Sequence, residues 1–243
     1  MLQLNKIHKG DCLELFEQLP DASVKMVLTD PPYGISYKSN MGAEGFQKEE
    51  IENDGFDDWL KVFPKWVRQI HRVLEPGGCL ALFCAGGGPV AALPHAWLEV
   101  ERRFGRVDNV LVWDRVDMGL GWRYRPVWES IIIAHKELSA KEKEATPEIW
   151  NGEANQTNIL RQPRIIPKAG DHPTPKPVPL LGRLIEHNTN EGDLVLDPFS
   201  GSGSTAEAAH LLKRDWLAFE MSDAYYKLST ARIAALQAQP TMF

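Results

Sequence analysis

Two short polar segments of this chain carry residue types suited to chemistry on an aromatic amino group. The first reads Asp-Pro-Pro-Tyr over residues 30–33 and directly follows the strand-like run 24–29. Such an amino group is a poor nucleophile because its lone pair is delocalised into the ring, and acceptors for its N–H groups free that lone pair. The Asp30 carboxylate and the Pro31 carbonyl are such acceptors, and the Tyr33 ring offers a face for stacking a base. A plain surface turn is the alternative, which the position after a strand disfavours.

The second segment reads Asp-Pro-Phe-Ser-Gly-Ser-Gly-Ser-Thr over residues 197–205 and follows another apolar run. Gly201 and Gly203 let the backbone approach a ligand closely, and Glu220 lies where an acid can bind ribose hydroxyls. We therefore interpret the segment as a loop around a nucleoside-like cofactor. The spacing Gly201-x-Gly203-x-x-Ala206 also fits a dinucleotide fingerprint, so an NAD- or FAD-dependent oxidoreductase is the alternative from a different class. That alternative leaves the first segment without a role.

The elements that must position both segments alternate along the chain. The strand-like runs cover residues 24–29, 79–84, 107–113, 127–134, 194–197 and 216–219, and the helical patterns cover 12–19, 57–74, 179–187, 204–212 and 223–237. This alternation predicts an α/β fold with a mainly parallel, doubly wound sheet and helices on both faces. Such a sheet builds its ligand crevice from loops at strand ends. We expect one domain over 1–243, with a mobile loop at 34–56 and a small recognition insert at 137–171.

The composition is that of an ordinary globular protein, with 43% hydrophobic and 25% charged residues in a chain of 243. No apolar run is long enough to span a bilayer, and the N-terminus has no secretory layout. Three cysteines without a close pair argue against a disulfide framework or a zinc site. We predict a cytoplasmic protein without a metal. A net charge of −6 does not by itself suggest nucleic acid, although basic residues gather between 161 and 176.

At its two polar segments the chain resembles the S-adenosylmethionine-dependent DNA amino-methyltransferases, in the β arrangement, where the catalytic motif precedes the cofactor loop. The resemblance extends to Lys9–Glu14, to Trp113–Lys136 and to the His-Pro-Thr-Pro-Lys-Pro segment at 172–177. It implies a Rossmann-like methyltransferase fold with permuted motif order and S-adenosylmethionine as the cofactor. It also implies double-stranded DNA as the substrate, with the target base flipped out of the duplex.

The resemblance also bears on the target base and on partners. Aspartate at the first position of the catalytic motif favours the N6 amino group of adenine, and the N4 amino group of cytosine is the alternative. Members of the family often dimerise. The resemblance therefore implies a possible homodimer, and a cognate restriction enzyme is a further partner to test.

Carried over to this sequence, the resemblance assigns two sets of residues. The catalytic set is Asp30, Pro31, Pro32 and Tyr33. The cofactor-binding set is Asp11, Cys12, His172, Pro173, Thr174, Lys176, Asp197, Pro198, Phe199, Ser200, Gly201, Ser202, Gly203, Ser204, Thr205 and Glu220. For Asp11 a second interpretation stays open, since aspartate is also a preferred N-cap and a helix is predicted from residue 12.

Overall fold

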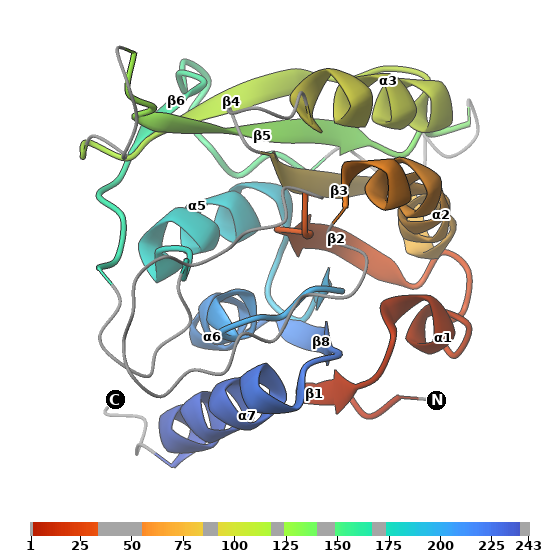
Figure 1. Ribbon diagram of the computed structural model, residues 1–243, viewed down its shortest axis with the longest axis vertical. Helices are drawn as coiled ribbons and strands as arrows, with labels where there is room; N and C mark the ends of the chain where they lie inside the picture. The colour runs from red at the N-terminus through yellow and green to blue at the C-terminus, as the bar shows by residue number, and fades with distance from the viewer. Residues whose placement is uncertain are drawn as a thin grey trace.

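The computed structural model describes residues 2–33, 55–84, 92–117, 124–139, 149–166 and 174–238, and one eight-stranded sheet organises these ranges (Figure 1). The strands are β1 (Lys6–Lys9), β2 (Val24–Thr29), β3 (Leu74–Cys84), β4 (Asn109–Asp114), β5 (Trp128–His135), β6 (Ile159–Arg161), β7 (Leu194–Asp197) and β8 (Asp215–Glu220). The helices are α1 (Cys12–Phe16), α2 (Phe56–Val73), α3 (Ala92–Phe104), α5 (Val178–Asn188), α6 (Ser204–Leu211) and α7 (Asp223–Gln237).

The sheet is mainly parallel, which confirms the predicted fold class. Its strand order is β1-β8-β7-β2-β3-β5-β4-β6, and among these strands only β5 runs antiparallel to its neighbours. The chain continues from β2 to β3 on one side and from β7 to β8 on the other, so the strand order reverses between β2 and β7. An open α/β sheet forms its ligand crevice at the carboxyl ends of the strands at such a switch point. The segments 30–33 and 197–205 follow these two strands.

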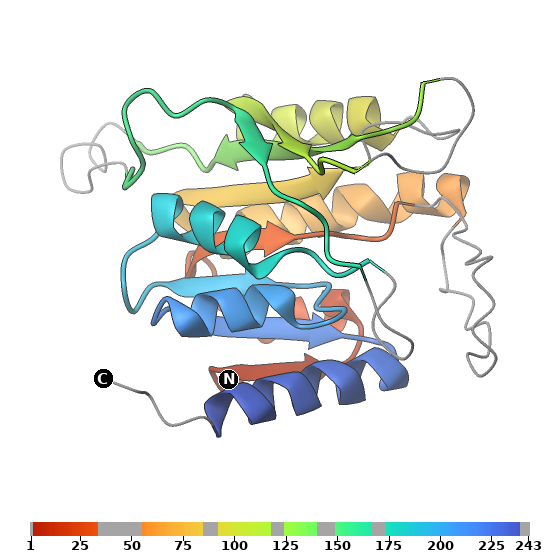
Figure 2. The same ribbon diagram turned by 90° about the vertical axis from the view of Figure 1, so that its left-hand side faces the viewer.

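Helices cover both faces of the sheet, as Figures 1 and 2 show. Helices α1, α2 and α3 pack on one face, and α5, α6 and α7 pack on the other. All six residues of β2 are buried between these layers. Val27 belongs to the first core, whereas Met26 and Leu28 belong to the second. A one-residue slip would exchange the two faces, so this packing fixes where Asp30 leaves the sheet.

Three elements form where the sequence patterns predicted none. β1 and β6 each bury a single side chain, Ile7 and Leu160, and are too short to leave a period-two pattern. β6 lies within the predicted insert 137–171, for which the sequence patterns gave no strand, and it pairs with β4 at the sheet edge. α3 leaves no clear helical pattern of large apolar residues in the sequence. Two of its four buried residues are alanines, and the larger side chains of Trp97 and Leu98 are exposed.

The strand predicted at 79–84 is longer in the structure, where β3 begins at Leu74. The pairing with β2 shifts there from Val24 opposite Leu74 to Met26 opposite Cys79, so the extra residues form a bulge. Gly77 has a φ of 73° and donates its N–H to the carbonyl of Lys136.

Residues 34–54, most of the predicted loop 34–56, lie outside the described residues. No helix in the described ranges is long and apolar enough to cross a membrane.

Candidate active site

The two polar segments meet at the switch point between β2 and β7. Thr29 ends β2 and donates its Oγ1 hydrogen to Oδ1 of Asp197, the last residue of β7, over 2.7 Å. The N–H of Phe199 donates to the same oxygen over 3.1 Å. Asp197 is only 5% exposed, and this burial raises the pKa of its carboxyl group to about 6 although its hydrogen bonds favour the charged form.

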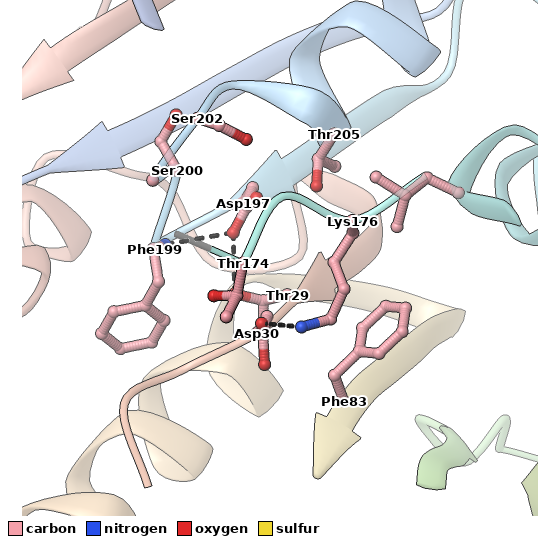
Figure 3. A pocket seen from close by; sticks show the side chains of 12 residues that line it. Thr29, Asp30, Phe83, Thr174, Lys176, Asp197, Phe199, Ser200, Ser202 and Thr205 are labelled. Atoms are coloured by element: carbon pink, nitrogen blue, oxygen red, sulfur yellow. Dashed lines mark hydrogen bonds and ion pairs between the residues drawn. The ribbon is translucent and has the colours of Figure 1, made fainter. Parts of the chain in front are cut away.

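A cavity of about 70 Å³ opens beside this junction (Figure 3). Its walls come from the ends of β2, β3 and β7, from the start of α5 and from the glycine loop. Twelve of the described residues line it: Thr29, Asp30, Phe83, Thr174, Lys176, Leu181, Asp197, Phe199, Ser200, Gly201, Ser202 and Thr205. The space accommodates part of a ligand, and both Asp30, the predicted catalytic residue, and the predicted cofactor loop line it.

Both carboxylate oxygens of Asp30 are engaged. Tyr33 donates its hydroxyl hydrogen to Oδ1, and Lys176 forms an ion pair with Oδ2. Burial and the neighbouring Asp30 raise the pKa of the Tyr33 hydroxyl well above its ordinary value, so Tyr33 remains a donor. Burial acts to lower the pKa of Lys176, but Asp30 and Glu129 outweigh it and raise this pKa, so the ammonium stays charged.

Lys176 occupies a narrow site between two carboxylates and two aromatic rings. Its Nζ lies 3.4 Å from Oε2 of Glu129, and its side chain is 11% exposed. The ammonium also lies 5.2 Å from the ring centroid of Phe83 and 5.9 Å from that of Trp113, distances at which a cation is attracted to a ring face. Glu129 in turn contacts Arg115, whose Nη1 donates to Oε1 over 3.1 Å. Lys176, which is predicted to bind the cofactor, therefore contacts Asp30, the predicted catalytic aspartate, directly.

The glycine loop is held by backbone hydrogen bonds and by one acid. Ser200 donates its N–H to the carbonyl of Phe219 over 2.8 Å, and Gly203 donates its N–H to the carbonyl of Ser200 over 2.8 Å. Glu220 accepts from the N–H of Gly201 at Oε2, over 2.7 Å, and from the N–H of Ser222 at Oε1, over 2.9 Å. Burial raises the pKa of the Glu220 carboxyl group above its ordinary value.

One side chain of this loop points to a ligand. The hydroxyl of Ser200 is buried, lines the cavity and has no hydrogen-bond partner among the described residues. A buried polar group without a partner is costly, which a bound polar ligand would relieve. Beside it, the ring of Phe199 packs against Trp66 of α2, with centroids 4.7 Å apart, and so is fixed at the wall of the cavity.

The remaining predicted site residues are distributed around this centre. Asp11 caps α1, because its carboxylate accepts from the N–H of Leu13 over 2.7 Å. Cys12 lies in the apolar core, where burial raises the pKa of its thiol. Pro31 is buried and Pro32 partly buried. Pro198, Gly203 and Ser204 belong to the loop without lining the cavity, and His172 and Pro173 lie outside the described residues.

Sequence reasoning missed four residues at this site. Thr29 and Phe83 lie at or near the carboxyl ends of β2 and β3, a position that could have identified them. Leu181 lies on the buried side of α5. Glu129 could not have been located this way, because it lies at the amino end of β5 and reaches the site only because β5 runs antiparallel.

A second cavity lies far from these residues. It measures about 570 Å³ and is bounded by the amino end of β4, the carboxyl end of β5, the segment 150–160 and the last turns of α5. Because β5 is antiparallel, this places it at the opposite edge of the sheet. None of the predicted site residues within the described ranges lines it.

Comparison with known proteins identifies the family. The sequence model of the family described as DNA methylase (N6_N4_Mtase) matches residues 24–231. The Type II methyltransferase M.BamHI of Bacillus amyloliquefaciens is 28% identical over 251 residues, which cover 90% of this chain and 55% of that protein. The chain thus spans little more than half the length of this relative. The Type II methyltransferase M2.MboI of Moraxella bovis is 26% identical over 239 residues, covering 93% of this chain and 86% of that protein.

Solved structures share the fold. The TTHA0409 protein of Thermus thermophilus, in complex with S-adenosyl-L-methionine, matches with a TM-score of 0.68 at 24% identity, covering 95% of this chain and 93% of its own. The cytosine-N4-specific PvuII DNA methyltransferase matches with a TM-score of 0.68 at 19% identity, covering 98% and 87%. The M1.HpyAVI complex with S-adenosylmethionine gives a TM-score of 0.65 at 23% identity, covering 93% and 98%. Because the family model matches most of the sequence, this chain belongs to the N6/N4 DNA methylase family, a family of S-adenosylmethionine-dependent methyltransferases.

Proposed function

We propose that this chain methylates the exocyclic N6 amino group of adenine in a specific DNA sequence, with S-adenosylmethionine as the methyl donor. The observation that carries the proposal is the position of the Asp30 carboxylate at the switch point, where it lines the cavity. The preceding residue, Thr29, is hydrogen-bonded to Asp197, the residue at which the glycine loop begins. Membership of the DNA methylase family supports the same chemistry.

The residues around the cavity fit S-adenosylmethionine. Ser200 offers an unpartnered hydroxyl, the loop 199–205 offers a close backbone approach, and Thr174 approaches from the α5 side. Glu220 would support cofactor binding indirectly, because its carboxylate accepts a hydrogen bond from the N–H of Gly201 and so holds the loop. When bound, the cofactor supplies an electrophilic methyl group. Asp11, Cys12, His172, Pro173 and the other assigned cofactor residues remain predictions.

The role of the chain in the reaction is to bind and orient the amino group. Asp30 and the carbonyl of Pro31 accept its two N–H groups, which favours a nitrogen whose lone pair is free to attack. The negative charge of Asp30 stabilises the positive charge that develops on that nitrogen. The Tyr33 hydroxyl holds the carboxylate in place, while its ring offers a stacking surface for a flipped base.

Aspartate at position 30 favours adenine, and cytosine N4 is the alternative because both bases present an exocyclic amine. The PvuII enzyme, named as cytosine-N4-specific, shares the fold at 19% identity. The dinucleotide interpretation of the glycine loop is set aside, since the DNA methylase family model covers that loop.

The wider assignments also stand as proposals. We expect double-stranded DNA as the substrate and a single catalytic domain over 1–243, with recognition by 137–171 and a mobile loop at 34–56. Homodimer formation, a cognate restriction enzyme and a cytoplasmic location remain predictions.

Transfer of labelled methyl groups from S-adenosylmethionine to unmethylated duplex DNA tests the proposal, with product nucleosides separated by mass spectrometry. We expect N6-methyladenine from the wild type and no product from Asp30→Ala. N4-methylcytosine would keep the mechanism and change the base. Cofactor binding without transfer to any DNA would overturn the proposal, and calorimetric titration with S-adenosylmethionine supplies that control.

A further inference from the structure

Four alternating charges form a row from the catalytic turn to the end of β4. Asp30 contacts Lys176, Lys176 lies 3.4 Å from Glu129, and Glu129 lies 3.1 Å from Arg115. The side chains are 26%, 11%, 21% and 16% exposed in that order, so water screens them little. We call these four residues the charge row.

The free protein leaves little room for a substrate amino group at Asp30. Oδ1 already accepts from Tyr33, and Oδ2 is paired with Lys176. Each carboxylate oxygen has two lone pairs, so an incoming N–H group would share Oδ2 with the Lys176 ammonium and find a weaker acceptor there. The shared contact also affects the chemical step, because an ammonium in contact with Asp30 offsets the negative charge that would stabilise a cationic nitrogen.

Glu129 offers Lys176 a second carboxylate. Its Oε2 lies 3.4 Å from Nζ, so a small rotation of the lysine side chain exchanges one carboxylate partner for the other. Arg115 holds Glu129 in this position, and Arg115 is itself fixed because its Nη2 donates to the carbonyl of Pro126 over 2.8 Å. The rings of Phe83 and Trp113 line the space in which the ammonium moves.

We propose that Glu129 is a positioning residue that draws the Lys176 ammonium from Asp30 when the target amino group binds, so that Oδ2 becomes available to that group. No bond is made or broken in this exchange, and the charge row stays neutral throughout. The inference rests on the proposed function, because it requires an amino group at Asp30. It adds a residue that belongs to neither polar segment.

Single-turnover methylation at saturating DNA and S-adenosylmethionine tests this role. Glu129→Gln keeps the size of the side chain and removes its charge, so we expect the rate to fall about 10- to 100-fold while the dissociation constant for S-adenosylmethionine stays within about twofold. Glu129→Asp should recover part of the rate. Asp108→Asn is the matched control: Asp108 is 18% exposed and pairs with His135 at the opposite edge, and its variant should keep the wild-type rate.

A double variant separates positioning from a merely structural role. If Glu129 acts through Lys176, adding Glu129→Gln to Lys176→Met should change the rate by less than about twofold. Losses that multiply would overturn the inference, as would a wild-type rate for Glu129→Gln or an equal loss for Asp108→Asn. A wild type that binds S-adenosylmethionine but methylates no DNA would overturn the proposed function itself, and the inference with it.

Discussion

The hydroxyl of Thr29 and the carboxylate of Asp197 join two strand ends that lie 168 positions apart in the sequence. One residue after Thr29 comes the catalytic-type aspartate, and two residues after Asp197 comes the first cavity-lining residue of the glycine loop. The hydrogen bond thus sets the position of the substrate side of the cavity relative to the cofactor side. Both partners are almost completely buried.

Thr29→Val should lower both the stability of the protein and its affinity for S-adenosylmethionine. Valine keeps the shape and removes the donor, leaving Asp197 with one hydrogen bond fewer, so we expect a loss of about 1–3 kcal/mol in the free energy of unfolding. Binding of S-adenosylmethionine should weaken as well. Denaturant unfolding and calorimetry measure the two effects, and Thr29→Ser, which keeps the hydroxyl, is the control. A Thr29→Val variant as stable as the wild type would contradict this view of the junction.

Asp197 should make stability depend on pH in an unusual direction. Its pKa is about 6 in the folded protein against 3.8 for the free group, so the folded state binds a proton more readily than the unfolded state. The contribution of Asp197 to stability therefore increases as pH falls through about 6 towards 4, by up to about 3 kcal/mol. Asp197→Asn lacks this titration. The difference in unfolding free energy between wild type and Asp197→Asn, measured from pH 4 to 7.5, should change accordingly; a constant difference would refute the assignment.

Tyr33→Phe should separate the hydroxyl of this residue from its ring. Phenylalanine retains the stacking face but no longer orients Asp30, so we expect the methylation rate to fall about 10-fold with cofactor affinity unchanged. Tyr33→Ala removes the ring too and should lose more. Because the pKa of Tyr33 is raised, its hydroxyl should not titrate below pH 10, and the ratio of wild-type to Tyr33→Phe rates should stay constant from pH 6 to 9. Equal losses for the two variants would deny the hydroxyl a role.

Glu220→Ala should affect the cofactor before the chemistry. The variant loses the acceptor for the N–H groups of Gly201 and Ser222, so the glycine loop is held less firmly. We expect the dissociation constant for S-adenosylmethionine to rise about 10-fold or more. Glu220→Gln retains one carbonyl acceptor, so its dissociation constant should lie between those of the wild type and Glu220→Ala. An unchanged dissociation constant for Glu220→Ala would remove Glu220 from the cofactor site.

Gly203→Ala should destabilise the protein, in contrast to the same change at Gly182. Gly203 has a φ of 77°, and an added Cβ would lie 3.1 Å from Cβ of Ser229. We expect a loss of about 1–3 kcal/mol. Gly182 lies inside α5, where a Cβ would meet only Cδ1 of Leu212 at 3.8 Å, so Gly182→Ala should raise stability by up to about 1 kcal/mol. Thermal unfolding compares the two, and equal effects would refute the conformational argument.

The elements best predicted from sequence are those with a strong, local pattern. β2 and α7 begin and end where the sequence predicts, at Val24–Thr29 and Asp223–Gln237. In β2 continuous burial leaves an almost uniformly apolar run, and in α7 Ser222 supplies an N-cap. β1 and β6 could not be predicted, because their stability comes from pairing with distant strands and not from their own few residues.

The site shows the same division. The sequence could indicate that the segments 30–33 and 197–205 lie at the same edge of the sheet, because each follows a predicted strand. The contact between Lys176 and Asp30 could not be predicted, because it depends on how the segment before α5 approaches the end of β2. The position of Glu129 at the site could not be predicted either, because it depends on the direction of β5 in the sheet. Composition and periodicity do not encode that direction.

The neutrality of the charge row has a consequence for how the protein responds to ionic strength. The four charges are partly buried, cancel one another and interact over distances shorter than the Debye length, so added salt should affect them little. The chain as a whole carries a net charge of −6, so its approach to the proposed DNA substrate would depend on basic residues such as those between 161 and 176, whose attraction salt screens strongly. Ionic strength should therefore act on the encounter with DNA and spare the step that follows, so that a salt titration separates association from chemistry.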